Sequence, residues 1–578
     1  MKAADKKYIN LRMFIVGIVF SLFFATIGAK AVYLQVYRGT WLSQKAANQY
    51  ESIVKSSGKR GKIYDKNLRE MAVSIDVTSV AAHPRQIDDA KKTAAVLAKA
   101  LKIDRNALYR KLSSDKKFVW IKRQVTPKEG EAVRNLGVSG IDFIPEHNRF
   151  YPSKITAAQV LGFTDIDDQG IEGLEFYYDN YLQGTTSKSM ILKDALGRGF
   201  DAEQKTFINN SGNNLILTID RTTQYIAEKE LSDTVETFSA KSGIAIVMVP
   251  KTGAILALAH VPFFNPNMVN KYNQEFWRNR VITDPFEPGS TMKIFSAAAA
   301  IESGSCSSNS IFYCENGAYK IGRNVVHDTH KHGWLSLQQI IKHSSNIGAI
   351  KFTETTGAEM LYKTLHGFGF GEKMGIDCPG ESGGSLAPYQ RWTKLDTGAI
   401  SFGQGISVTA LQLIAATCAI ANEGILMKPH IVQAITDHNG RLIKSFMPKK
   451  IRQAVSSRTA NTVKRLMQTV VTEGGTGVNA AIEGYSVCGK TGTAQKIDQK
   501  GEYAKDKFIS SFVGFLPAEN PEVAILIVID EPRKSHYGGV VAAPAFRNIA
   551  EKIIDYMNIS PRGKTKKMTV SLRGGTTG

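Results

Sequence analysis

The chain has 578 residues, of which 43% are hydrophobic and 22% are charged, and its net charge is +21. This length is too great for one hydrophobic core and predicts about two to four structural units, while the composition argues against a chain that is mostly disordered. The excess of 73 Lys and Arg over 52 Asp and Glu indicates either high solubility or an anionic neighbour. Anionic lipid or another anionic polymer fits better than nucleic acid, because no zinc-finger spacing or other nucleic-acid motif is present.

An apolar run lies near the amino terminus. Residues 13–29 carry no charge, and the apolar character continues to Val36. About 20 such residues cross a hydrocarbon layer, so we expect a transmembrane anchor over residues 13–36. Four basic residues within 1–12 predict a cytoplasmic tail there and place the rest of the chain outside. A cleaved signal peptide is the alternative, because Ala29-Lys30-Ala31 resembles a cleavage site, but the run is longer than a usual signal core.

The segment that follows, residues 37–213, is mixed in character. Polar helix-like stretches such as Asp88 to Lys102 alternate with short strand-like runs. No group of catalytic side chains stands out here. We therefore expect a pedestal domain that acts as a spacer or docking platform.

From residue 214 the pattern changes to a larger domain, residues 214–558. Apolar runs predict strands at 215–220, 243–249, 254–259, 508–515 and 523–530, and helical spacing predicts helices at 222–238 and 543–557. Strands at both ends of a helical middle predict an α/β (α+β) fold with a central antiparallel sheet and helices on both faces. Residues 559–578 are basic and Gly-rich, which predicts a disordered tail.

The first of three short motifs is Ser290-Thr291-Met292-Lys293. Pro288 and Gly289 end the preceding element, so Ser290 lies at a predicted helix start, where N–H groups favour a developing anion. The i,i+3 spacing puts Lys293 on the same helical face. A serine hydroxyl is a weak nucleophile, and a lysine with a lowered pKa can activate it. The S-x-x-K pattern also occurs at Ser56, Ser113 and Ser114, so it is not specific alone.

The other two motifs are Ser344-Ser345-Asn346 and Lys490-Thr491-Gly492-Thr493. On a tight turn, the Ser344 hydroxyl and the Asn346 amide can both reach one cavity, to relay a proton and to hold a substrate carbonyl. Lys490 and the threonines suit a substrate carboxylate, and Gly492 is expected to let a substrate backbone approach closely. Both patterns have a second copy, Ser307-Ser308-Asn309 and Lys251-Thr252-Gly253, and the latter is better explained as a turn.

The order and spacing of the three motifs make them specific together. S-x-x-K, then S-x-N, then K-T-G near the last strands resembles the penicillin-binding and serine β-lactamase superfamily. Further segments resemble motifs of class B penicillin-binding proteins: Arg60-Gly61-Lys62-Ile63-Tyr64-Asp65, Arg149-Phe150-Tyr151-Pro152, Gly170-Ile171-Glu172-Gly173-Leu174-Glu175, Gly403-Gln404-Gly405 with Thr409, Gly474-Gly475-Thr476 and Ser511-Phe512-Val513-Gly514-Phe515. This chain has Lys66, Leu68 and Met71 where the family has Arg, Gly and Leu, so the turn there is expected to differ.

The resemblance implies a role for each motif residue. Ser290 would attack the carbonyl between the last two D-alanines of a peptidoglycan stem peptide, and Lys293 would take its proton. The N–H groups of Ser290 and Thr493 would form the oxyanion hole. Ser344 would pass a proton to the leaving amine, and Asn346 would hold a substrate amide. The terminal carboxylate would bind Lys490, Thr491 and Thr493. A β-lactam would acylate Ser290, and no metal or organic cofactor is needed.

The same resemblance implies the setting of the enzyme. Phe286 to Ser290, the K-T-G-T sequence and the short pedestal favour the division-specific FtsI type over the elongation type. We therefore expect a single-pass protein of the bacterial inner membrane that acts in the periplasm at the septum. Its partners would be lipid-linked glycan strands, a SEDS-type (FtsW-like) glycan polymerase and other division proteins. A D,D-carboxypeptidase, a β-lactamase and a non-catalytic β-lactam sensor or scaffold are the alternatives.

Two further patterns have no place in these motifs. Cys306 and Cys314 lie close in sequence and would be able to form a disulfide outside the cytoplasm, with an odd cysteine left over among the five. His327, His330 and His332 suggest a metal site, but a polar loop before Ser344 is the simpler interpretation.

Overall fold

The computed structural model describes residues 3–56, 58–185, 187–193, 199–200, 211–498 and 501–561. The chain divides into two compact units, Met1–Gly58 with Gly184–Ser211 and Lys59–Gln183 with Gly212–Gly578. The predicted disordered tail falls outside the described residues from residue 562 onward.

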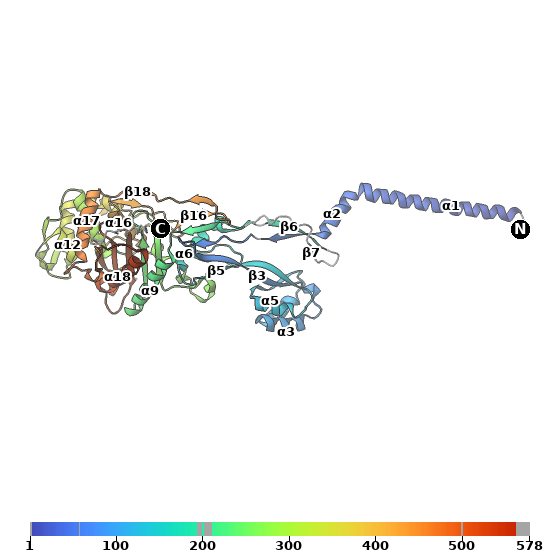
Figure 1. The fold of residues 1–578 in the computed structure, drawn as a ribbon, viewed down its shortest axis with the longest axis horizontal. Coiled ribbons are helices and arrows are strands. Elements are labelled where there is room, and N and C mark those ends of the chain that lie inside the picture. The colour runs from blue at the N-terminus through green and yellow to red at the C-terminus, as the bar shows by residue number, and fades with distance from the viewer. Residues whose placement is uncertain are drawn as a thin grey trace, which may run out of the picture. The chain divides into compact units, whose positions relative to one another are not determined.

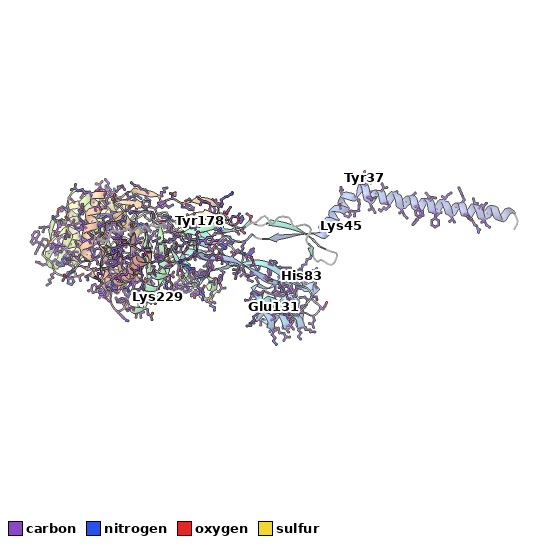
Figure 2. The ribbon with its side chains drawn as sticks, viewed as in Figure 1. Tyr37, Lys45, His83, Glu131, Tyr178 and Lys229 are labelled. Atoms are coloured by element: carbon purple, nitrogen blue, oxygen red, sulfur yellow. The ribbon has the colours of Figure 1, made fainter. Side chains whose placement is uncertain are left out.

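The first unit contains the apolar segment. Helix α1 (Ala3–Val32) begins before the predicted span, and its large apolar side chains are exposed (Figure 2). It continues into a π-helical turn (Tyr33–Tyr37), and within the described ranges Tyr8–Tyr37 is the one helix long and apolar enough to cross a membrane. Helix α2 (Gly39–Tyr50) and an antiparallel sheet complete the unit, and the strands of that sheet are β1 (Glu51–Ser56), β6 (Ser187–Lys193) and β7 (Gly199–Phe200).

The second unit contains a seven-stranded sheet that crosses the expected boundary at residue 213. Its strand order is β17-β16-β8-β2-β3-β4, and β5 also pairs with β3. The strands are β2 (Ile63–Tyr64), β3 (Glu70–Ala82), β4 (Val119–Val125), β5 (Ile141–Phe150), β8 (Asn214–Leu217), β16 (Val432–Thr436) and β17 (Leu442–Ser445). Strand β8, predicted at 215–220, pairs in parallel with β2 and antiparallel with β16. Pedestal and catalytic segments therefore share one sheet.

Strands β3 and β5 run side by side from this sheet into a pedestal lobe, residues 83–143 (Figure 1). The lobe contains α3 (Ala90–Leu101), α4 (Arg105–Leu112) and α5 (Pro127–Arg134), packed on β4 around a core that includes Leu97 and Leu108. The helices begin where caps are available, because Asp89, Asp104 and Thr126 accept backbone N–H groups of their first turns. The helix predicted at 88–102 is confirmed.

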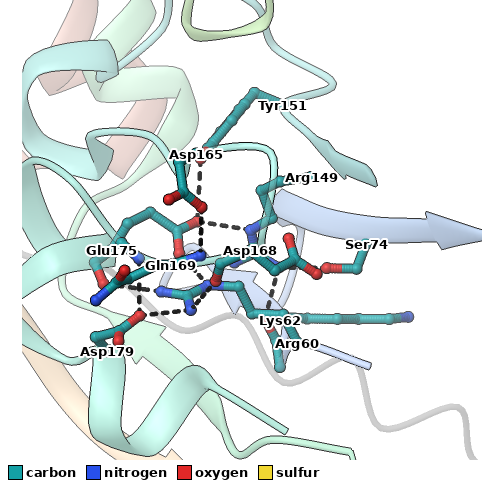
Figure 3. A network of polar contacts seen from close by, with 12 residues as sticks. Arg60, Lys62, Ser74, Arg149, Tyr151, Asp165, Asp168, Gln169, Glu175 and Asp179 are labelled. Carbon is teal, nitrogen blue, oxygen red and sulfur yellow. Dashed lines mark hydrogen bonds and ion pairs between the residues drawn. The ribbon is translucent and has the colours of Figure 1, made fainter. Parts of the chain in front are cut away.

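The three pedestal motifs meet in one buried ion-pair network (Figure 3). Glu175 lies between two guanidinium groups: it accepts from Arg60 Nε at 2.7 Å and from Arg149 Nε at 2.6 Å. These three side chains are essentially inaccessible to solvent. Arg60 also binds Asp179, and Tyr151 donates to Glu175. Since buried charges are tolerated only when paired, the motifs fix how these segments pack together.

The predicted central sheet is confirmed as a five-stranded antiparallel sheet in the order β10-β9-β21-β20-β19. The strands are β9 (Ser242–Met248), β10 (Ile255–Val261), β19 (Cys488–Ile497), β20 (Tyr503–Leu516) and β21 (Val523–Asp530). Alternate residues of β21 join different hydrophobic clusters, Leu526 with α16 (Ala410–Ala421) and Ile527 with α9 (Arg221–Thr237) and α18 (Gly538–Met557). Helices thus cover both faces, as predicted.

The other helices and the small strand pairs complete the second unit. The helices are α6 (Ala158–Leu161), α7 (Gly173–Tyr177), α8 (Asp179–Leu182), α10 (Arg280–Thr283), α11 (Lys293–Glu302), α12 (Leu337–His343), α13 (Asn346–Thr356), α14 (Ala358–Gly367), α15 (Lys394–Ser401) and α17 (Ser457–Val470). The small strand pairs are β11 (Ile311–Tyr313) with β14 (Trp334–Ser336), β12 (Ala318–Ile321) with β13 (Asn324–His327), and β15 (Ile425–Met427) with β18 (Lys450–Gln453). Short 3₁₀ turns include η5 (Gly289–Met292).

Candidate active site

The turn that contains Ser290, which we call the nucleophile turn, lies against β19, an edge strand of the central sheet. Ser290 is half-buried in η5, directly before α11. Gly289 has a φ of +54°, and a Cβ atom there would lie 2.7 Å from the Thr493 carbonyl oxygen. Gly403 has a φ of +89°, and a Cβ atom on it would lie 2.2 Å from the Gly289 oxygen. Two glycines therefore allow η5 to enter the gap between β19 and the 403–405 loop.

Lys293 is fully buried beside the nucleophile. Its Nζ lies 2.9 Å from Ser290 Oγ, 2.6 Å from the Ser344 carbonyl oxygen and 2.7 Å from Asn346 Oδ1. Burial lowers the pKa of Lys293 to about 7, against the opposing effect of the Asp328 charge. A neutral amine can donate its two hydrogens to the two oxygens that only accept, which leaves its lone pair for the Ser290 proton. This is the arrangement of a general base with an adjacent nucleophile.

The S-x-N motif forms a junction between two helices. Ser344 ends α12 in the left-handed conformation, with a φ of +63°, and Ser345 caps α13 by accepting from Gly348 N–H. Ser344 Oγ is 2.8 Å from Lys490 Nζ and 3.3 Å from Lys293 Nζ, so it can pass a proton between the two amines. The Asn346 amide holds Lys293 through Oδ1 and donates through Nδ2 to the His327 oxygen. The tight turn expected from the sequence is present.

Asp328 holds this junction, and sequence reasoning missed it. Its carboxylate accepts from Ser345 Oγ at 2.5 Å and from the N–H groups of Asn346 at 2.5 Å and Ile347 at 3.0 Å. Asp328 is separated from the motif by a loop, the short strand β14 and helix α12, so no local spacing connects the two. The only signal was its position beside three histidines in a polar segment.

The K-T-G-T sequence forms the wall of the site along β19. Lys490 is fully buried, and burial, followed by the nearby Lys293 charge, holds its pKa well below the ordinary value. Thr491 Oγ1 lies 2.9 Å from Thr476 Oγ1, which ties β19 to the 474–476 segment. Thr493 Oγ1 accepts from Gly538 N–H.

Gly492 has a packing role that was not expected from the sequence. A Cβ atom there would lie 2.3 Å from Ser511 Oγ and 2.8 Å from Thr291 Cγ2. The missing side chain therefore makes room for the neighbouring strand and for the nucleophile turn. The expectation that Gly492 also lets a substrate backbone approach stays a prediction.

These side chains meet at a cavity of about 630 Å³. Ser290, Ser344, Asn346, Thr491 and Thr493 all line it, whereas Lys293, Lys490 and Gly492 lie behind its surface. Phe508, His536 and Tyr537 form an aromatic side of the cavity, with Phe508 stacked on His536. The structure thus brings together all three motifs in one cleft that is open to a peptide-sized ligand.

The remaining sequence features lie elsewhere or differ from expectation. Cys306 and Cys314 are both free thiols, as are the other three cysteines, so the suggested disulfide is absent. Within the described ranges no three His, Cys, Asp or Glu side chains are placed to hold a metal ion. Instead, His330 lines the cavity and His332 stacks on His343. Lys251-Thr252-Gly253 forms the turn between β9 and β10.

Comparison with known proteins agrees with this geometry. The family described as "Penicillin binding protein transpeptidase domain" matches residues 243–551, and "Penicillin-binding Protein dimerisation domain" matches residues 55–217. The probable peptidoglycan D,D-transpeptidase PenA of Neisseria meningitidis is 35% identical, with 97% of this chain and 95% of the relative covered. Peptidoglycan D,D-transpeptidase FtsI of Escherichia coli is 33% identical, with 93% and 90% covered. Stage V sporulation protein D of Bacillus subtilis is 32% identical, with 93% and 84% covered.

A solved structure shows the same fold. Penicillin binding protein 3 of Mycobacterium tuberculosis, complexed with aztreonam, superposes with a TM-score of 0.69 at 27% identity, covering 88% of this chain and 98% of that one. The two family matches follow the order seen in the structure, with the pedestal segment before the catalytic one. The chain therefore belongs to the penicillin-binding proteins, as a class B member whose dimerisation domain precedes its transpeptidase domain.

Proposed function

We propose that this class B penicillin-binding protein is a serine D,D-transpeptidase that cross-links peptidoglycan stem peptides during septal wall synthesis. The observation that supports this most is the position of Lys293 Nζ, fully buried and within hydrogen-bond distance of Ser290 Oγ, Ser344 and Asn346. A buried lysine that contacts a serine hydroxyl and is held by two obligate acceptors is poised to take the serine proton.

The first half of the reaction forms the acyl-enzyme. Ser290 Oγ attacks the carbonyl carbon between the last two D-alanines as its proton moves to Lys293 Nζ. The oxyanion is held by the N–H groups of Ser290 and Thr493. The C–N bond then breaks, and the leaving D-alanine amine takes a proton through Ser344 Oγ, which lies between the two lysines. Lys490, Thr491 and Thr493 bind the terminal carboxylate of the donor, and Asn346 orients the stem-peptide amide.

In the second half, an amine of a neighbouring stem peptide attacks the ester carbonyl. As it attacks, this amine gives a proton to Lys293 Nζ, which is neutral again after the first half. Lys293 passes that proton to Ser290 Oγ as the ester bond breaks, and the new amide joins the two stems. A β-lactam acylates Ser290 because its strained amide imitates the D-alanyl dipeptide. Water in place of the acceptor amine would give a D,D-carboxypeptidase.

The cellular setting forms part of the proposal. The helix Tyr8–Tyr37 would serve as a single-pass anchor with the amino terminus in the cytoplasm, and the catalytic unit would lie in the periplasm. The relatives named FtsI support a role at the septum. An FtsW-like polymerase that supplies glycan strands is proposed as the partner from the family resemblance alone. Stage V sporulation protein D is also a relative, and its name refers to sporulation and not to the septum.

Covalent labelling of the full-length protein by a fluorescent penicillin tests the chemistry. The wild type should be labelled, and Ser290→Ala should not, while Ser307→Ala, in the second S-x-N copy, serves as the matched control. A natural stem pentapeptide with an acceptor amine then separates transfer from hydrolysis. Absence of labelling in the folded wild type would contradict the proposal and favour a scaffold. Depletion in cells should give filaments if the role is septal and rounded cells if the protein acts in elongation.

A further inference from the structure

The pedestal lobe, residues 83–143, carries much of the positive charge of the chain. It contains fourteen Lys or Arg residues and seven Asp or Glu residues. Five of the seven carboxylates are used inside the lobe: Asp89 and Asp104 cap helices, and Asp115, Glu129 and Asp142 bind Arg85, Lys122 and His83. Most carboxylates of the lobe are therefore already bound by groups within the lobe.

Most cations of the lobe have no ion-pair partner among the described residues. Eleven of them are exposed and form no ion pair among the described residues: Lys91, Lys92, Lys99, Lys102, Arg105, Arg110, Lys111, Lys116, Lys117, Lys128 and Arg134. Most lie on α3, on α4 and in the loop from α4 to β4, three consecutive segments of one small lobe. Such a concentration of unpaired charge attracts anions.

Aromatic side chains are exposed within the same segments. Tyr109 on α4 and Phe118 before β4 are 42% and 39% exposed. Phe118 packs edge to face on Trp120, whose backbone oxygen accepts from Lys111 Nζ. The Arg123 guanidinium lies over the Trp120 ring. Aromatic faces beside cations suit a ligand that has both apolar ring faces and carboxylates, as amino-sugar polymers with peptide side chains do.

We propose that the pedestal lobe binds uncross-linked peptidoglycan strands, with its cations on the carboxylates of successive stem peptides and its aromatic rings against the sugars. This rests on the proposed substrate of the enzyme, but not on the catalytic serine. The active-site cavity of about 630 Å³ holds the end of a stem peptide, not a strand. A second, multivalent contact on the same chain keeps the strand near the cleft between reactions and raises the local concentration of donor and acceptor stems.

The test measures binding of full-length protein in detergent to soluble, uncross-linked peptidoglycan strands. The protein is first acylated with penicillin, so that the cleft is blocked and the remaining binding reports other surfaces. The lobe variant reverses four exposed cations: Lys92→Glu, Lys99→Glu, Arg105→Glu and Arg110→Glu. The matched control reverses four exposed cations outside the lobe, in the segment from β17 to β18: Arg441→Glu, Lys444→Glu, Lys449→Glu and Lys450→Glu. Fluorescent penicillin labelling and thermal unfolding of both variants report that they are folded.

The lobe variant should bind strands at least about tenfold more weakly than the wild type. The control should bind like the wild type, because only local charge matters at moderate salt. Wild-type binding should also fall as sodium chloride is added. Equal binding by the lobe variant, or an equal loss in the control, would overturn the proposal. Binding to phosphatidylglycerol vesicles but not to strands would assign the lobe to the membrane instead. Ser290→Ala should still bind strands, which separates this inference from a failure of the catalytic proposal.

Discussion

Replacing Asp328 by Asn tests how the S-x-N junction holds the general base. The Asp328 carboxylate accepts from Ser345 Oγ, Asn346 N–H and Ile347 N–H. Asn offers one acceptor oxygen and no charge, so at least one donor is left unpaired. A hydrogen bond to a charged group contributes roughly 1.5–3 kcal/mol. Loss of that energy from the aligned junction should slow acylation roughly tenfold to a hundredfold.

The same substitution should move the pH profile in a defined direction. Burial lowers the pKa of Lys293 to about 7, and the Asp328 charge opposes that effect. Without the charge, the pKa of Lys293 falls further. Because the neutral amine is the base, acylation requires a pH above this pKa, and the acid limb of the profile lies near pH 7 in the wild type. In Asp328→Asn the limb should shift to lower pH even though the maximal rate is smaller.

The assay is the second-order rate constant for acylation by a fluorescent penicillin, measured across a range of pH. Asp437→Asn is the matched control, since Asp437 also accepts backbone N–H groups in a turn, between β16 and β17. Its rate and its acid limb should equal those of the wild type. An acid limb that stays in place or moves to higher pH in Asp328→Asn would refute the electrostatic part of the reasoning, whatever the rate.

Three further substitutions test the packing around the site and the pedestal. Glu175→Gln removes the ion-pair partner of buried Arg149 and leaves Arg60 with Asp179 alone, and chemical denaturation should show a loss of about 3–5 kcal/mol; an unchanged midpoint would argue against the network. Gly492→Ala places a Cβ atom 2.3 Å from Ser511 Oγ and should slow penicillin acylation about a hundredfold by displacing the nucleophile turn, with a wild-type rate as the contrary result. Leu68→Gly relieves a left-handed φ of +61° on an exposed side chain, so the free energy of unfolding should rise by about 0.5–1 kcal/mol, and a decrease would mean that Leu68 packs usefully.

The local elements could be predicted because their signals are local. The strand expected at 523–530 has those bounds, and the helix expected at 222–238 differs by one residue at each end. The pairing of β8 could not be predicted in the same way. The apolar run at 215–220 indicates a strand. Its partners β2 and β16 lie far away in sequence, and only the tertiary fold selects them.

The same distinction separates the site residues that sequence reasoning found from those that it missed or described incompletely. Ser290, Lys293 and Asn346 stand in short motifs whose order is informative. Asp328 stands in no motif, because its function is to bind backbone N–H groups, and these exist at every position of a chain. Gly492 was assigned to substrate, since a glycine in a strand signals a close approach without naming what approaches.

The structure adds one relation that no motif contains, the convergence of two buried lysines on the Ser344 hydroxyl. Burial lowers the pKa of both lysines, and the charge of Lys293 lowers the pKa of Lys490 further. In the proposed mechanism, the donor carboxylate arrives beside Lys490 and favours its charged form. That charge in turn favours neutral Lys293, which is the form that accepts the serine proton. Binding of the substrate carboxylate thus prepares the general base, so an ester or amide of the terminal D-alanine should lose acylation rate as well as affinity.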